Sequence, residues 1–174
     1  AVNALTTGEI DISLNVTGQL IKQVSASDKL VLSQNTEPRL AYIGFNLSDP
    51  ILSNDKVREA LSTAIDRKTI VDGVYANGDG ELSVLPVPKV SWGYSEEQES
   101  LVPAYDVEKA KSLLAEAGYP DGFDVVLTTG TQNAYVQAAT LVQEQLKQIG
   151  VNVEIQSVSS TEVTDRYLNN KVQM

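Results

Sequence analysis

Apolar residues recur at helical spacing between residues 53 and 75, where the sequence reads SNDKVREALSTAIDRKTIVDGVY. One stripe follows the 3.6-residue period and predicts an amphipathic helix; its members are Val57, Ala60, Leu61, Ala64 and Ile65. The apolar residues after position 69 are out of phase with that stripe, so one straight helix does not fit. Asp66 is therefore predicted to cap a second helix that starts at Arg67.

The same period returns near the end of the chain, between two segments with strand character. Residues 123–129 (FDVVLTT) and 151–158 (VNVEIQSV) are predicted strands, and residues 133–149 are a predicted helix between them. The apolar face of this helix comprises Ala138, Val142, Leu146 and Ile149. Since such crossovers are right-handed with parallel strands, we expect an α/β domain whose helices pack on a largely parallel or mixed sheet.

Two further helices have recognisable starting signals. Asp106 is predicted to cap a helix with an apolar stripe from Val107 to Ala117, and Gly118 can take the left-handed conformation that ends it. Ser159 and Glu162 resemble the capping box of a last helix reaching about residue 170. A short helix is expected around residues 20–24.

Three earlier segments favour the extended conformation. Residues 10–12 and 29–34 alternate between apolar and polar residues, and residues 39–47 (RLAYIGFNL) are rich in residues of high β-propensity. We therefore expect a strand in each. Residues 76–103 have little periodicity and predict a long loop that contains the only tryptophan, Trp92. Trp92 would either be exposed for a functional contact or pack in a small apolar cluster beneath the loop.

Composition and charge restrict the possible chemistry. The chain has 174 residues, which suits one domain, and a net charge of −10, which disfavours binding to nucleic acid or anionic lipid. Since the sequence contains neither Cys nor His, it excludes Cys nucleophiles, zinc sites built on Cys or His, and triads with a His base. No apolar run approaches the roughly 18–20 residues of a membrane span.

The remaining polar groups single out no catalytic or metal site. No pair of carboxylates is marked as an acid–base couple, and Glu96, Glu97 and Glu99 lack the ligand pattern of a calcium loop. We therefore expect no catalytic residue, metal or cofactor. The first residue, Ala1, indicates either a removed targeting segment or a piece of a longer protein.

Six motifs in a fixed order make the pattern specific. They are GEIDI (8–12), AYIGFN (41–46), SNDKVREALSTAIDRKTIV (53–71), VLPVPK (84–89), YDVEKAKSLLAEAGYPDGF (105–123) and LKQIGVNVEI (146–155). This set resembles the extracytoplasmic solute-binding proteins of oligopeptide and dipeptide ABC transporters, family 5. The resemblance covers residues 8–174 and implies a type II periplasmic-binding-protein-like fold of two α/β lobes joined by a hinge.

The resemblance also implies how this chain relates to the two lobes. Residues 1–174 look like a single domain, most of the second lobe, with residues 1–38 approaching from the hinge and residues 39–174 forming the main body. The family's Gly-Trp…Asp segment, which carries ligand contacts in peptide-binding members, has no counterpart in this sequence. The candidates for lining the cleft are Tyr42, Phe45, Asn46 and Trp92. The alternative for Asn46 is to hold the turn before Pro50.

The implied function is solute capture outside the membrane. The lobe would bind a peptide or a related small solute together with the other lobe, close about the hinge and deliver the solute to a membrane permease. The protein would be a monomer, either free in the periplasm or a lipoprotein on the cell surface, with no enzymatic activity and no nucleic-acid partner. Two alternatives stay open: a sensory or regulatory solute-binding module, and a hydrolase that uses two carboxylates, such as a glycosidase.

Overall fold

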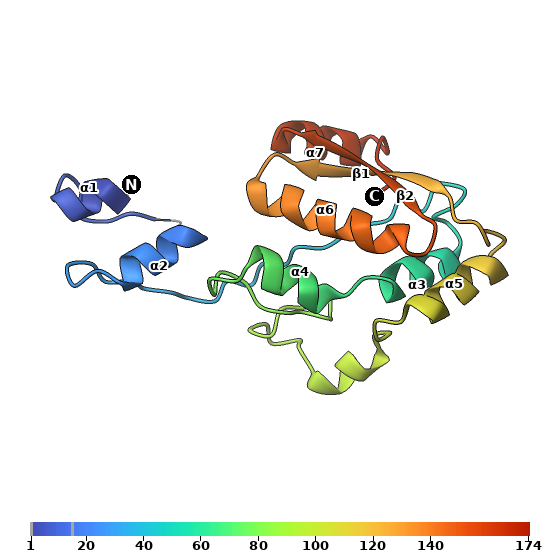
Figure 1. The fold of residues 1–174 in the computed structure, drawn as a ribbon, viewed down its shortest axis with the longest axis horizontal. Helices are drawn as coiled ribbons and strands as arrows, with labels where there is room; N and C mark the ends of the chain where they lie inside the picture. Colours follow the sequence, from blue (N-terminus) through green and yellow to red (C-terminus); the bar gives the residue numbers. More distant parts are fainter. Residues whose placement is uncertain (1, 15) are drawn as a thin grey trace.

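The computed structural model describes residues 2–14 and 16–174, and Figure 1 shows how their helices and strands are arranged. None of the helices in these residues has the length and apolar character of a membrane-spanning helix. In chain order the elements are α1 (Val2–Thr7), α2 (Gln19–Ser25), α3 (Asp55–Thr63), α4 (Arg67–Val74), the 3₁₀ helix η1 (Glu96–Leu101), α5 (Val107–Glu116), β1 (Asp124–Gly130), α6 (Asn133–Lys147), β2 (Asn152–Val158) and α7 (Ser160–Leu168).

The predicted crossover unit is confirmed. Strands β1 and β2 pair in parallel, from Asp124 opposite Asn152 to Gly130 opposite Val158. Helix α6 lies against the sheet, and the apolar residues of the three elements enter one core. On α6 the buried alanine is Ala139, whereas Ala138 is half-buried. The buried residues that join the three elements are Val125, Leu127, Ala139, Val142, Leu146, Ile149, Val151 and Val153.

The predicted helix pair is also present. All five residues of the first apolar stripe are buried, and α3 packs against α5. Asn54 caps α3 by accepting the N–H of Lys56 at 3.0 Å. Asp66 occupies the N-cap of α4, where its carboxylate accepts the N–H groups of Lys68 and Thr69 and, at 2.6 Å, the Thr69 hydroxyl. The chain bends between the helices because the capping residue does not have helical backbone angles.

A buried glutamine joins this bend to α6. Gln145 is 8% exposed, and its amide makes two hydrogen bonds with the backbone of Asp66. The Asp66 N–H donates to Oε1 at 2.9 Å, while Nε2 donates to the Asp66 carbonyl at 3.3 Å. Since a buried amide is unfavourable without partners, these two bonds fix how α4 sits on α6.

The two other predicted helix N-caps, Asp106 and Ser159, are confirmed. Asp106 caps α5 by accepting the N–H of Lys109 at 2.9 Å, and Gly118 follows with a φ of 94°. Ser159 caps α7 by accepting the N–H of Glu162 at 3.2 Å. These caps depend on contacts within four residues, which explains why local sequence identified them.

The three early strand predictions are wrong, because residues 10–12, 29–34 and 39–47 are not part of any strand that the structure describes. Residues 29–34 are largely exposed, with Val31 95% exposed, and have no neighbouring strand to pair with. Ile43 and Phe45 do pack against the core, so their apolar character reflects burial rather than strand pairing. At the end of this segment the Asn46 N–H donates a hydrogen bond to the Gln173 carbonyl, at 2.9 Å.

The segment 172–174 extends the sheet beside β1. The Met174 N–H donates to the Val126 carbonyl at 3.1 Å, and the Thr128 N–H donates to the Met174 carbonyl at 2.9 Å, a pattern made by parallel strands. The Gln173 side chain accepts the Val126 N–H and donates to Asp49. The hydrogen-bonded neighbours across the body are therefore, in order, residue 46, residue 173, strand β1 and strand β2.

The long loop is ordered around η1 but does not bury its tryptophan. Trp92 is fully exposed, so the predicted apolar cluster beneath the loop does not include it. Tyr94 is held instead by a hydrogen bond from its hydroxyl to Glu99, which raises the pKa of Tyr94 to about 12. A side chain in an apolar cluster is surrounded by other apolar side chains, whereas the Trp92 indole is exposed to solvent.

The N-cap of α4 gives a stability prediction with a defined pH dependence. We expect Asp66→Ala to lower the free energy of unfolding by about 0.5–2 kcal/mol, and Asp66→Asn to lower it less, because Asn still accepts N–H bonds. The Thr69 hydroxyl and then the N–H groups of Thr69 and Lys68 hold the pKa of Asp66 below its usual value, against the opposing effect of burial. The charge-dependent stabilisation is therefore complete above the ordinary aspartate pKa of about 3.9 and disappears as the pH falls through the lowered pKa.

Denaturant unfolding of the three proteins between pH 7 and pH 2.5 measures this effect, with the exposed Asp165→Ala as a control on another helix. The N-cap role is contradicted if the Ala and Asn variants have equal stability at pH 7.

The buried glutamine gives a second stability prediction. Gln145→Leu leaves the backbone N–H and C=O of Asp66 without these partners, so we expect a loss of about 1–3 kcal/mol despite the apolar replacement. Gln137, exposed on the same helix, supplies the matched control Gln137→Leu. Urea unfolding followed by circular dichroism measures both variants, and an unchanged midpoint for Gln145→Leu would show that the two Gln145 hydrogen bonds contribute nothing to stability.

Candidate ligand-binding site

The two parallel strands end at the same edge of the molecule. β1 ends at Gly130 and β2 at Val158, and each is followed within a few residues by the start of a helix, α6 or α7. In open α/β sheets ligands bind in the crevice outside the carboxyl ends of the strands. We call residues 130–135 and 158–160 the carboxyl edge and take it as the candidate site.

Polar side chains cross the carboxyl edge between the two strand ends. The Gln132 amide donates to the Ser160 hydroxyl at 3.0 Å, and the Ser157 hydroxyl donates to the Gly130 carbonyl at 3.3 Å. Gln132 is the N-cap residue of α6, but its side chain does not cap the helix. The edge therefore presents an exposed amide and hydroxyl, which can both donate and accept hydrogen bonds.

Gly130 sets the position of the Gln132 side chain. A Cβ atom added at Gly130 would lie 2.2 Å from Gln132 Oε1 and 3.4 Å from the Tyr135 ring. Only glycine leaves room for the amide to fold back over the end of β1 in this way. The orientation of Gln132 thus depends on a residue without a side chain.

A second group of polar residues lies beside this edge, in the loop after α4. Burial raises the pKa of Tyr75, and the nearby Tyr135 and Asp79 raise it further. Asp79 accepts the N–H of Gly18 at 2.8 Å, so the loop also meets the start of α2. One side-chain oxygen of Asp79 and that of Asn77 are buried without a hydrogen-bond partner.

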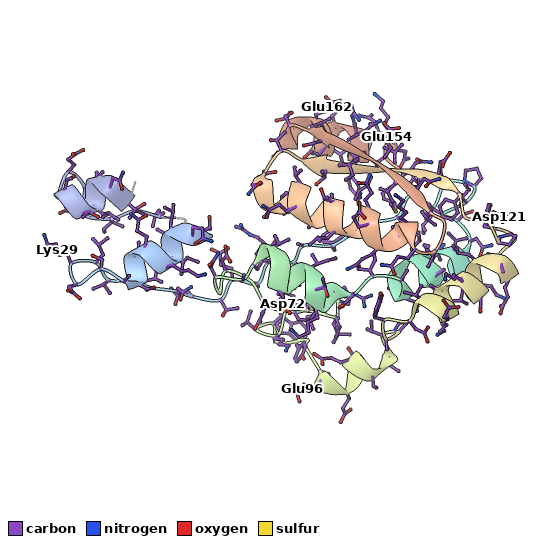
Figure 2. The ribbon with its side chains drawn as sticks, viewed as in Figure 1. Lys29, Asp72, Glu96, Asp121, Glu154 and Glu162 are labelled. Atoms are coloured by element: carbon purple, nitrogen blue, oxygen red, sulfur yellow. The ribbon has the colours of Figure 1, made fainter. Side chains whose placement is uncertain are left out.

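An open hollow of about 390 Å³ lies at the opposite end of the same strands. It is lined by the first residues of β1 and β2 and by Gln173, and it carries the carboxylates Asp124 and Glu154. Glu154, on strand β2, is labelled in Figure 2. We prefer the carboxyl edge as the ligand site, because the amino ends of parallel strands are not where such folds bind ligands.

The predicted cleft residues lie in different surroundings. Tyr42 is 82% exposed, and Phe45 is partly buried against the core. The Asn46 side chain accepts the Ser48 N–H at 2.9 Å and donates to the Val172 carbonyl at 2.8 Å, so it holds the turn before Pro50. These two bonds use one of the two amide hydrogens and one of the two oxygen lone pairs of Asn46.

Trp92 and residues 42–46 are not joined by hydrogen bonds or ring stacking in the part of the chain that the structure describes. Their common role in a cleft therefore stays a prediction. Sequence reasoning did not single out Gln132, Tyr135 or Ser160. The predicted crossover already placed these residues at strand ends, so the general rule for ligand sites in α/β sheets would have identified them.

The described residues bring no group of three or more acidic, His or Cys side chains close enough to hold a metal ion. The chemistry available at the carboxyl edge is hydrogen bonding by neutral groups, supplemented by aromatic surface from Tyr135, which is 41% exposed. This arrangement is suited to holding a polar organic molecule in place.

Known proteins with similar sequences point to one family. The family model of bacterial extracellular solute-binding proteins, family 5 Middle, matches residues 1–174. The chain is 34% identical to the oligopeptide-binding protein AppA of Bacillus subtilis over 171 residues, which are 91% of this chain and 31% of that protein. It is 38% identical to the heme-binding protein A of Haemophilus influenzae over 120 residues, 69% of this chain and 21% of that protein.

A solved structure agrees with these sequence matches. The periplasmic binding protein DppA from Helicobacter pylori, in complex with the peptide STSA, superposes with a TM-score of 0.84 at 26% identity. The match covers 99% of this chain and 33% of DppA, so the chain spans about a third of the length of such relatives. The expected α/β fold of the type II periplasmic binding proteins is confirmed, and the chain belongs to family 5 of the bacterial extracellular solute-binding proteins.

Proposed function

We propose that this chain is most of one lobe of a two-lobed receptor that captures a peptide or a related small solute outside the membrane. Family membership over all 174 residues is the observation that carries the proposal. In the intact protein, residues 39–174 would form the main body of the lobe and residues 1–38 would approach it from the hinge. The receptor would act as a monomer and deliver its solute to the permease of an ABC transporter.

Unpaired apolar surface supports the idea that the chain functions next to further protein. Ile12, Leu14 and Val31 are 78%, 81% and 95% exposed, and all three lie in the first 38 residues. Exposed apolar residues gathered in one region typically mark a surface that another protein segment covers. The other lobe of the same receptor is the partner that fits this position.

The chemistry of the carboxyl edge supports a peptide as the solute. A peptide offers backbone N–H and C=O groups, which the amide of Gln132 and the hydroxyl of Ser160 can pair with. A peptide also ends in a carboxylate, and the N-terminus of α6, which has no side-chain cap, favours negative charge. Tyr42, Phe45, Asn46 and Trp92 are the further residues we propose for the cleft.

Solute capture also accounts better for the chain than catalysis does. The family is one of binding proteins, and the carboxyl edge offers neutral hydrogen-bonding groups rather than a paired acid and base. Membership of an extracellular family supports a location outside the cytoplasm, where the protein would be free in the periplasm or a lipoprotein on the cell surface. Ligand binding would then bias an equilibrium between open and closed lobes, with no covalent step.

A shared site predicts that one lobe binds poorly. We expect the intact protein, expressed from its complete gene, to bind the peptide Ser-Thr-Ser-Ala or members of a mixed peptide library with micromolar affinity. The 174-residue chain should bind the same peptides on the order of millimolar or more weakly, because half the contacts are missing. Isothermal titration calorimetry compares the two proteins. Micromolar binding by the chain alone would place the whole site within these residues, and an intact protein that binds no peptide would exclude peptides as the solute.

The carboxyl edge gives a residue-level prediction in the intact protein. Gln132→Ala should weaken peptide binding by up to about tenfold, the effect of one lost hydrogen bond worth about 0.5–1.5 kcal/mol. Gln137→Ala changes an exposed glutamine of the same helix and should leave the affinity unchanged. Equal affinities for both variants and the parent would remove Gln132 from the site, provided that their thermal stabilities are the same.

A further inference from the structure

Residues 2–14 and 16–38 form a separate packing unit beside the main body. In Figure 1, α1 and α2 lie beyond the end of the body at which α4 ends and α6 begins, and α1 lies farther out than α2. Figure 2 labels Lys29 at the side of this unit that faces away from the body. The buried apolar residues of the unit are Val2, Ile21 and Val24, and none of them belongs to the main core. We call the described residues 2–14 and 16–38 the N-terminal arm.

One hydrogen bond spans the space between arm and body. The Gly18 N–H donates to the Asp79 carboxylate at 2.8 Å, across 61 positions of sequence. Apart from contacts between chain neighbours at residues 37–39, the described residues show no other hydrogen bond or ion pair between arm and body. A bond between a backbone N–H and a charged acceptor is stronger than a neutral one, and this bond is partly buried.

Both partners are arranged for this contact. Gly18 has φ 60° and ψ −135°, a conformation open to glycine and strained for other residues, and it directly precedes α2. Asp79 lies in the loop after α4 and is followed by Gly80. A Cβ atom added at Gly80 would lie only 2.7 Å from the Tyr75 ring. The loop is therefore packed closely on a tyrosine of the body, and its carboxylate is held toward the arm.

The connection between the two units is otherwise weak. Residues 30–38 contain no helix or strand and join the arm to the body as an extended segment. An extended segment without regular hydrogen bonding can absorb large changes of its backbone angles, as hinges do. The arm can therefore swing about this segment unless a contact outside it holds the arm in place.

We propose that Asp79 is a latch that holds the N-terminal arm against the body through the Gly18 N–H and thereby sets the orientation of the two lobes in the intact receptor. The second half of this inference rests on the proposed function, because residues 1–38 lead toward the other lobe only in a two-lobed protein. Release of the latch frees the arm, and its formation favours one orientation of the lobes. The latch thus changes ligand affinity without any contact between Asp79 and the ligand.

Spin-label distances in the 174-residue chain test the latch without any ligand. The sequence has no cysteine, so Lys29→Cys on the arm and Glu144→Cys on α6 give a unique labelled pair on exposed positions. We expect a single narrow distance population in the parent chain and loss of that population in Asp79→Ala. Asp79→Asn keeps an acceptor oxygen and should retain more of the narrow population than Asp79→Ala.

Two further variants separate the latch from general effects on folding. Gly18→Ala meets no neighbouring atom but strains the backbone that presents the N–H, so it should also broaden the distance distribution. Asp72→Ala removes an exposed carboxylate of α4 that pairs with Lys68, and should leave the narrow population intact. In Asp79→Ala, hydrogen exchange of the Gly18 amide should become faster while the amides of β1 keep their protection.

The outcomes distinguish the latch from the proposed function. A broad distribution in the parent chain, or equal distributions in the parent chain and Asp79→Ala, overturns the latch and leaves solute capture unaffected. A confirmed latch in a receptor whose intact form binds no peptide would contradict the proposed solute instead. In an intact receptor that binds Ser-Thr-Ser-Ala, a changed affinity for Asp79→Ala but not for Asp72→Ala supports the second half of the inference, and equal affinities overturn it.

Discussion

The position of α4 depends on one buried amide. Gln145 reaches from α6 to the bend before α4 and satisfies both backbone groups of Asp66. The Asp66 carboxylate is thereby free to cap α4, whose far end leads into Tyr75 and the loop that carries Asp79. That loop lies beside the carboxyl edge and contacts the N-terminal arm. A single side chain in the core thus relates the sheet, the candidate site and the arm to one another.

The elements that could be predicted from the sequence are those whose signals are local. The caps Asp66 and Asp106 are identified by contacts within a few residues, and the helix stripes by the period of their apolar residues. The crossover unit followed because two apolar strands flank one amphipathic helix and the connection allows only one hand. These elements make up most of the region from residue 53 to residue 168.

The three failed strand predictions share a physical cause. A strand exists only where a neighbouring strand supplies hydrogen bonds, and the residues alone do not say whether that neighbour is present. Ile43 and Phe45 have strand-like character because they pack on the core, while Val31 is exposed and its segment pairs with no strand that the structure describes. In the same way, the sequence could not reveal that Gln145 is buried, since a glutamine within an amphipathic helix is normally exposed.

The candidate site was missed although the predicted parallel crossover implied it, because no local motif marks its residues. Gln132 and Ser160 are 28 positions apart, and only the parallel register places both beyond the strand ends. The predicted cleft residues were chosen from the family pattern, and the structure shows Asn46 occupied by the turn and Trp92 exposed to water. The exposed indole is available to a ligand or to another lobe in the proposed receptor. The exposed indole and the exposed apolar residues of the arm are the apolar surfaces that a ligand or the other lobe would cover in the proposed receptor.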